Sequence, residues 1–73
     1  MSNLPRISGR DCVKALQKKN YLFIRQTGSH IILRRTDPFL QVTIPDHKEL
    51  DRGTLRSIIR QANLSIEEFN SLL

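Results

Sequence analysis

The stretch Thr27-Gly28-Ser29-His30 stands between two apolar runs, residues 21–27 and 30–35, that have the composition of β-strands. A glycine at the first central position of a two-residue loop favours a hairpin with a type II′ turn. This turn sets three cross-strand pairs whose six side chains share one face of the ribbon: Thr27 with His30, Arg25 with Ile32, and Phe23 with Arg34. The hairpin therefore predicts an imidazole beside two guanidinium groups.

This cluster has the chemistry needed to act on a phosphodiester. Guanidinium groups bind phosphate, and an imidazole takes up or releases a proton near neutral pH. A histidine that only caps the hairpin fits the same spacing. The spacing alone therefore leaves both interpretations of His30 open.

The two faces of the predicted hairpin differ in chemistry. One face collects four aliphatic side chains that we expect the helices to cover: Leu22, Ile24, Ile31 and Leu33. The other face interleaves apolar and basic side chains, as sheets that bind RNA do: Tyr21, Phe23 and Ile32 with Arg25, Arg34 and His30. Because large apolar side chains are costly to leave in water, a face partly covered by a partner chain or a terminus is the alternative.

Helices are predicted on both sides of the strands. The first runs from Gly9 to about Lys19, with Ser8 and Asp11 as a capping box and Asn20 as a left-handed stop. A loosely ordered lead is expected at residues 1–7, and a turn at 36–39 precedes a third strand with one buried face at 40–45. A second helix is predicted at 52–63 and a short C-terminal helix at 65–73.

This order predicts an α+β fold. Three antiparallel strands with helices on one face make an α-β-β-β-α sandwich, to which the short C-terminal helix is added. The same order is found in the double-stranded RNA-binding domain (dsRBD). Fold alone does not give function.

Length and composition exclude several classes of protein. A chain of 73 residues is predicted to be a single small domain, too small for a multi-step enzyme. Its one cysteine cannot form an internal disulfide, and one cysteine with two histidines does not make a zinc-type cluster, so we expect no metal and no cofactor. With no apolar run approaching the roughly 20 residues of a membrane span and no signal-peptide core, we expect a cytoplasmic protein without a membrane partner.

Positive charge is concentrated in the first half of the chain. Residues 1–35 carry eight basic side chains and one acid, whereas residues 36–73 carry four basic side chains and six acids. A basic surface attracts polyanions such as nucleic acid. Cations recur every four residues in both long helices, and three of them are candidate RNA contacts: Lys14, Lys18 and Arg56. Ordinary solvated helix faces are the alternative.

Four short stretches carry a family resemblance: Gln26-Thr27-Gly28-Ser29-His30, Val42-Thr43-Ile44-Pro45-Asp46-His47 with Glu49-Leu50, Gly53-Thr54-Leu55, and Ile58-Ile59-Arg60-Gln61-Ala62. In this order and spacing, from about residue 8 to 64, they resemble the HicA toxin family, also called YcfA-like. The resemblance implies a dsRBD-like fold, an mRNA interferase activity, and a HicB antitoxin that covers the active site. It also implies that His30, in the family's Gly-Ser/Thr-His motif, is catalytic. The chain departs from the family pattern at Asn63, where glycine is common, and in the tail from residue 65.

RNA cleavage without a metal needs a base for the 2′-hydroxyl proton, cations for the charged phosphorane and an acid for the leaving oxygen. His30 is the predicted base or acid, and Arg25, Arg34 and Ser29 are predicted phosphate contacts. His47 is the only other imidazole and the candidate for the second proton transfer, a role that Lys48 or water could also fill.

Two other functions fit the same residues. A nonenzymatic RNA-binding module would bind RNA with a steep dependence on salt and never cut it. A protein-interaction domain would use the predicted Phe23 and Ile32 face, on which an acidic segment of a HicB-like protein could dock. The oligomeric state is not predicted.

Overall fold

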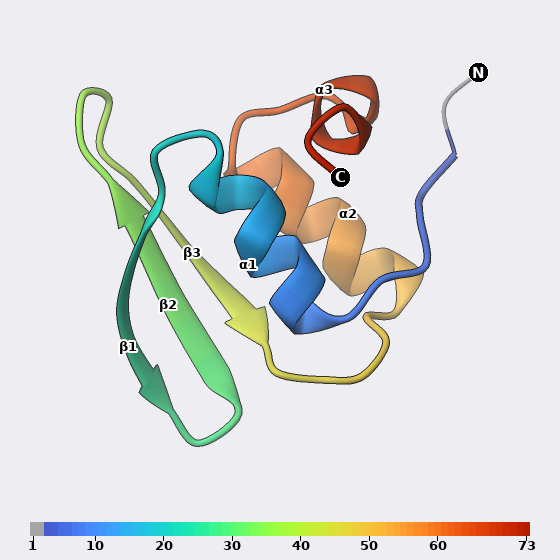
Figure 1. Ribbon diagram of the computed structural model, residues 1–73, viewed down its shortest axis with the longest axis horizontal. Coiled ribbons are helices and arrows are strands. Elements are labelled where there is room, and N and C mark those ends of the chain that lie inside the picture. Colours follow the sequence, from blue (N-terminus) through green and yellow to red (C-terminus); the bar gives the residue numbers. More distant parts are fainter. Residues whose placement is uncertain (1–2) are drawn as a thin grey trace.

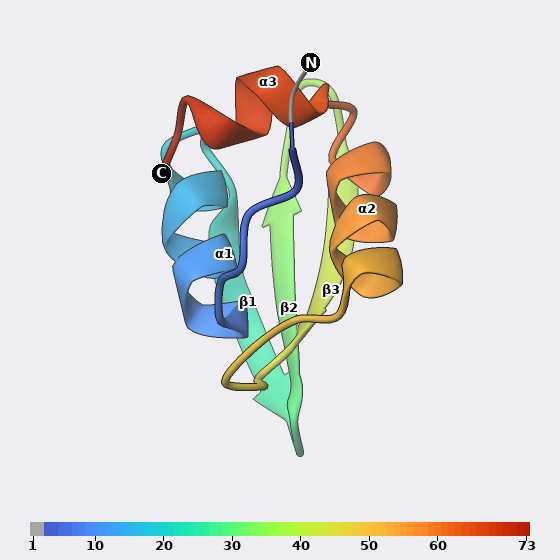
Figure 2. The same cartoon turned by 90° about the vertical axis from the view of Figure 1, so that its right-hand side faces the viewer.

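The computed structural model describes residues 3–73, and its elements follow the predicted order. They are α1 (Gly9–Gln17), β1 (Leu22–Thr27), β2 (His30–Arg35), β3 (Leu40–Pro45), α2 (Arg52–Gln61) and α3 (Ile66–Asn70). The strands form an antiparallel sheet in the order β1-β2-β3 (Figure 1). Figure 2 shows α1 and α2 side by side over one face of this sheet, with α3 crossing one end. The predicted α-β-β-β-α fold with a short C-terminal helix is confirmed.

The core lies between the sheet and the helices. Alternate residues of β2 and β3 are buried, as expected of strands with one face covered: Ile31, Leu33, Val42 and Ile44. The helices contribute the side chains that face them: Cys12, Ala15 and Leu16 from α1, Leu55, Ile58 and Ile59 from α2, and Phe69 from α3. None of the helices in residues 3–73 has the length and apolar character needed to cross a membrane.

β1 departs from the predicted register. Arg25 pairs with Ile32 as predicted, but Phe23 pairs with Leu33 rather than with Arg34, because Ile24 is an extra residue that forms a β-bulge. The bulge shifts the pattern of inward and outward side chains by one position along the rest of the strand.

Side chains before the bulge therefore do not lie where the sequence predicted them. Leu22 and Ile24, expected under the helices, are 66% and 37% exposed. Tyr21, expected on the opposite face, is buried in the core, and its hydroxyl donates to the carbonyl oxygen of Ala62 at 3.4 Å. The predicted four-residue aliphatic patch is thus wrong for its two β1 members.

The helix ends follow the predicted capping residues with one exception. Asn20 and Asn63 have φ values of 70° and 61°, so both stops are left-handed as predicted, although α1 already ends at Gln17. The Ser65 capping box has both of its hydrogen bonds. At the start of α1, Ser8 Oγ accepts from the Asp11 N–H at 3.0 Å, but the reciprocal bond is not among those formed in residues 3–73.

Gly9 brings the start of α1 against the backbone that follows β3. Its N–H donates to the carbonyl oxygen of His47 at 2.9 Å. A Cβ at this position would overlap the carbonyl group of Pro45, so only glycine fits without movement of the helix. This contact fixes α1 on the loop between β3 and α2.

The segment before α1 makes contacts with the core and with the rest of the chain. Leu4 is buried in the core, and Ile7 accepts a backbone hydrogen bond from Leu50 at 2.9 Å. The carbonyl of Asn3 accepts from the side-chain amide of Asn70 at 3.0 Å, which ties the segment to α3. Residues 3–7 therefore form no helix or strand but contact the core and α3, and residues 1–2 lie outside the described part of the chain.

Candidate functional site

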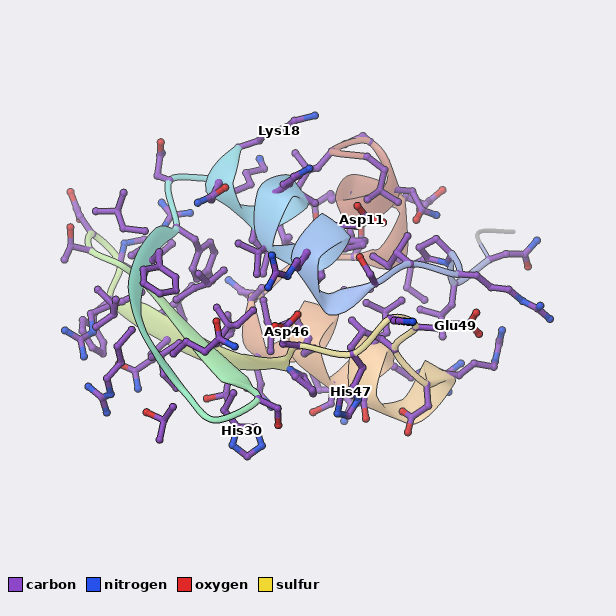
Figure 3. The ribbon with its side chains drawn as sticks, turned by 60° about the horizontal axis from the view of Figure 1, so that its bottom comes forward. Asp11, Lys18, His30, Asp46, His47 and Glu49 are labelled. Carbon is purple, nitrogen blue, oxygen red and sulfur yellow. The ribbon has the colours of Figure 1, made fainter. Side chains whose placement is uncertain are left out.

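The hairpin between β1 and β2 forms the centre of the candidate site. Thr27 pairs with His30, and of the two loop residues only Gly28 has a positive φ, +58°. A positive φ at the first loop position alone is the pattern of the predicted type II′ turn. Figure 3 shows the His30 ring projecting from the end of the sheet, where its side chain is exposed.

His30 and Arg25 lie on the sheet face that points away from the helices, which we call the outer face. Burial alternates along β2, so His30 and Ile32 point to the outer face. Arg25 pairs with Ile32 and is therefore a diagonal neighbour of His30. Diagonal neighbours lie roughly 7–8 Å apart, within reach of a long side chain. The predicted neighbourhood of an imidazole and one guanidinium group is thus present.

Arg34 lies on the outer face but not beside His30. It is four residues farther along β2, a distance of about 13 Å at the usual rise of a strand. Its Nε donates to Gln41 Oε1 at 2.9 Å, and its guanidinium carbon lies 5.6 Å from the ring centroid of Phe39. These contacts hold Arg34 at the opposite end of the outer face from the imidazole.

Asp46 joins the hairpin to α1. Its carboxylate accepts two hydrogen bonds from Arg10, at 3.1 and 3.2 Å, and a third from Gln26 Nε2 at 3.2 Å. Its backbone N–H donates to the carbonyl oxygen of Ser29 at 2.6 Å. The hydrogen bonds from Arg10 and then Gln26 hold the pKa of the Asp46 carboxyl below its usual value. Asp46 therefore fixes the backbone next to His30.

A surface groove of about 380 Å³ lies between the end of the sheet and α2. We call it the His30 groove. Its lining includes side chains from three elements: His30 from β2, Thr43 and Pro45 from β3, and Thr54, Ser57 and Gln61 from α2. His30 thus stands between this groove on the β3 side and Arg25 on the β1 side.

The other predicted RNA contacts lie on different surfaces. Lys14 and Lys18 are on the side of α1 that faces the C-terminal residues, and Lys18 Nζ donates to the Leu72 carbonyl oxygen at 2.8 Å. Figure 3 places Lys18 and His30 at opposite edges of the molecule. Arg56 is exposed on the side of α2 that faces α3. The structure does not bring these three cations to the hairpin.

His47 lies in the loop between β3 and α2. Its side chain is exposed, and it is not among the residues that line the His30 groove. Figure 3 shows the two imidazoles projecting from different segments, His30 from the start of β2 and His47 from the loop between β3 and α2. Across residues 3–73 no three His, Cys, Asp or Glu side chains gather in a way that could hold a metal ion.

Several residues of the site were not singled out from the sequence. Gln26 and Asp46 stand in the stretches that carry the family resemblance, but their hydrogen bond joins positions 20 residues apart. Thr43, Ser57 and Gln61 meet at the groove only because α2 packs beside β3. Periodicity within one element carries no signal of such contacts.

Comparison with protein-family models places the chain in a class of small bacterial toxins. Residues 9–64, most of the chain, match the model described as the HicA toxin of bacterial toxin-antitoxin systems. The chain therefore belongs to the HicA toxin family, as its motifs predicted. Among curated proteins, no match was found.

Proposed function

We propose that this toxin is an mRNA interferase, an endoribonuclease that cuts messenger RNA in the cytoplasm without a metal ion. Family membership supports a toxin. The observation that carries the proposal is the exposed imidazole of His30 on the outer face, with the guanidinium of Arg25 as a diagonal neighbour and the His30 groove beside it.

In the proposed reaction, a 2′-hydroxyl oxygen attacks the adjacent phosphorus atom and loses its proton to a base. The bond from phosphorus to the 5′ oxygen breaks, and an acid protonates that leaving oxygen. His30 serves as the base or the acid. Arg25 and the Ser29 hydroxyl are close enough along the hairpin to hold the reacting phosphate.

The remaining predicted residues take more distant roles in the proposal. Arg34 contacts RNA farther along the outer face, and Lys14, Lys18 and Arg56 contact it only if the strand extends around the molecule. His47 remains the candidate for the second proton transfer. For His47 to act, the RNA must reach from the hairpin to the loop between β3 and α2.

The toxin is proposed to be neutralised by a HicB-like antitoxin that covers the His30 hairpin. Toxins of toxin-antitoxin systems act with such a partner, and family membership supports this. An exposed catalytic histidine is easily blocked by a bound protein.

A nonenzymatic RNA-binding module is the second candidate function. It is favoured by the concentration of positive charge in residues 1–35. Such a module would lose affinity steeply with salt and would leave RNA intact.

The experiment compares the unaltered chain with His30→Ala and with the surface control Gln17→Ala. Each is expressed under tight induction while growth and bulk mRNA integrity are followed. The purified proteins are then assayed on RNA in the presence of EDTA. General acid–base catalysis is typically worth at least about 100-fold, so we expect His30→Ala to lose cleavage by that factor or more.

The control variant should cleave like the unaltered chain, and all three proteins should have the same circular dichroism spectrum. Cleavage by His30→Ala at the rate of the unaltered chain would refute the role of His30. RNA binding without cleavage by any of the proteins would assign the chain to the nonenzymatic module instead.

A further inference from the structure

The His30 groove is an open surface groove, large enough for one planar group and lined by polar side chains. Its volume of about 380 Å³ falls within the range of small-molecule pockets, roughly 300–1,000 Å³. Apart from His30, no residue lining it carries an ionisable side chain in the described part of the chain. The groove therefore suits a ligand whose inserted part carries no charge.

The polar groups of the groove are suited to reading the edge of a planar group. Hydroxyls of Thr43, Thr54 and Ser57 and the amide of Gln61 supply both donors and acceptors. Gln61 Nε2 donates to Ser57 Oγ at 3.0 Å, which orients the amide. Within residues 3–73 the Gln61 amide oxygen and the Ser57 hydroxyl hydrogen make no other hydrogen bond, so both remain for a ligand.

A charged surface and a neutral surface lie on opposite sides of His30, as the charged phosphate and the neutral base lie at opposite ends of a nucleotide. Arg25 lies on the β1 side of the imidazole and can hold a phosphate, whereas the neutral groove lies on the β3 side. With a phosphate at His30, the groove on the β3 side is a neighbouring surface that the base of an adjoining nucleotide can reach.

We infer that the His30 groove binds the base of one unpaired nucleotide next to the phosphate that is cut, with Ser57 and Gln61 bonding its edge. This inference rests on the proposed function, because it places the scissile phosphate at His30. The base must be unpaired because sequence-specific proteins reach the edges of RNA bases in single strands, where the bases splay outward. The site therefore selects single-stranded RNA and gives the toxin a base preference at the cut.

The first test measures binding with the full chain carrying His30→Ala, which keeps RNA intact. Each of the four nucleoside 3′-monophosphates is titrated while backbone amide shifts are recorded by NMR. We expect one nucleotide to bind most tightly and to shift the amides of residues 54–61. Adding Gln61→Ala should weaken that binding about tenfold and level the four affinities, as expected for loss of a base-edge contact. Adding Gln17→Ala should change nothing.

Equal binding of the four nucleotides with no effect of Gln61→Ala would overturn the inference. Duplex RNA and an acidic peptide are titrated in the same way, and shifts of the groove amides with either of these but with none of the nucleotides would also overturn the inference. Both Ser57 and Gln61 are exposed on α2, so alanine at either position leaves the core intact.

The second test separates the inference from the proposed function. Cleavage sites on a mixed RNA pool are sequenced for the unaltered chain, Ser57→Ala and Gln61→Ala. A base preference that both variants weaken supports the inference, whereas cleavage with an unchanged preference overturns it and leaves the proposed function standing. Nucleotide binding in the groove by a chain that never cuts RNA would refute the proposed function and leave the groove as a base-binding site.

Discussion

Replacing Gly9 by alanine tests whether the close contact between α1 and the end of β3 holds the fold together. The added Cβ would overlap the Pro45 carbonyl oxygen and lie 3.0 Å from the carbonyl carbon and 3.3 Å from Asp46 Cα. All of these atoms are backbone, so no side chain can rotate away, and α1 must move outward. That movement also strains the 2.9 Å hydrogen bond from the Gly9 N–H to His47.

The size of the effect follows from these contacts. Overpacking costs about 1–3 kcal/mol, and a weakened hydrogen bond costs about 0.5–1.5 kcal/mol. Alanine recovers about 0.4–1 kcal/mol by restricting the unfolded chain. The net expectation is a loss of about 2 kcal/mol, which lowers Tm by roughly 8–16 °C in a domain of this size.

Gly53→Ala provides the matched control. Gly53 is also near the start of a helix, but a Cβ there meets nothing within 4 Å. It should leave the free energy of unfolding unchanged or raise it by up to about 1 kcal/mol. Both variants are measured by urea unfolding followed by circular dichroism. If Gly9→Ala is as stable as Gly53→Ala, the reasoning from the α1 contact is wrong.

Two further predictions concern titratable groups. Burial raises the pKa of the Cys12 thiol to about 12. A thiol reagent at mildly alkaline pH should therefore label the unfolded chain quickly and the folded chain only slowly. Rapid labelling of the folded chain would contradict the burial of Cys12. The pKa values of Asp46 and Asp51 are lowered, chiefly by hydrogen bonds from Arg10 and Thr54 respectively. Their stabilisation is therefore present above the unfolded pKa of about 4 and is lost as pH falls through the folded values. The urea concentration at the unfolding midpoint should fall as the pH is lowered below about 4, and it should fall less steeply in Asp46→Asn. Parallel pH profiles for the two proteins would exclude a contribution of the Asp46 carboxylate to stability.

Most of the fold could be predicted because local signals agree with the final packing. Alternating Leu40, Val42 and Ile44 mark one buried face of β3, and Asn20 and Asn63 end helices where left-handed geometry is needed. These signals lie within a few residues of the structure they specify. They need no knowledge of the rest of the chain.

The bulge in β1 could not be predicted for a physical reason. Residues 21–24 are four apolar side chains in succession, so an inserted residue leaves no break in the pattern. What fixes the register is the burial of Tyr21 beneath α2, a contact with Ala62 that lies 41 residues away. Pairs nearer the turn, such as Arg25 with Ile32, were unaffected and were predicted correctly.

The candidate site shows the same division between local and long-range information. His30 and Arg25 come together through one short turn, so the sequence predicted them as neighbours. The apolar stripe of α1 fixes which of its faces meets the core, but not where the helix lies relative to the hairpin. The position of Lys14 and Lys18 beside the C-terminal residues therefore could not be predicted. Asp46, which follows β3, bonds Arg10 of α1 and Gln26 of β1. These residues are far apart in the sequence, so their contacts could be recognised only in the folded chain.

The exposure of β1 has a consequence for the motions of the hairpin. All six of its residues are exposed, and it is the edge of the sheet, so it is stabilised by few buried contacts and is expected to open locally well before the core unfolds. His30 belongs to β2 and also pairs with Pro45 of β3. When β1 detaches, Arg25 leaves with it while His30 stays paired with β3, so transient opening separates the guanidinium from the imidazole without displacing the histidine.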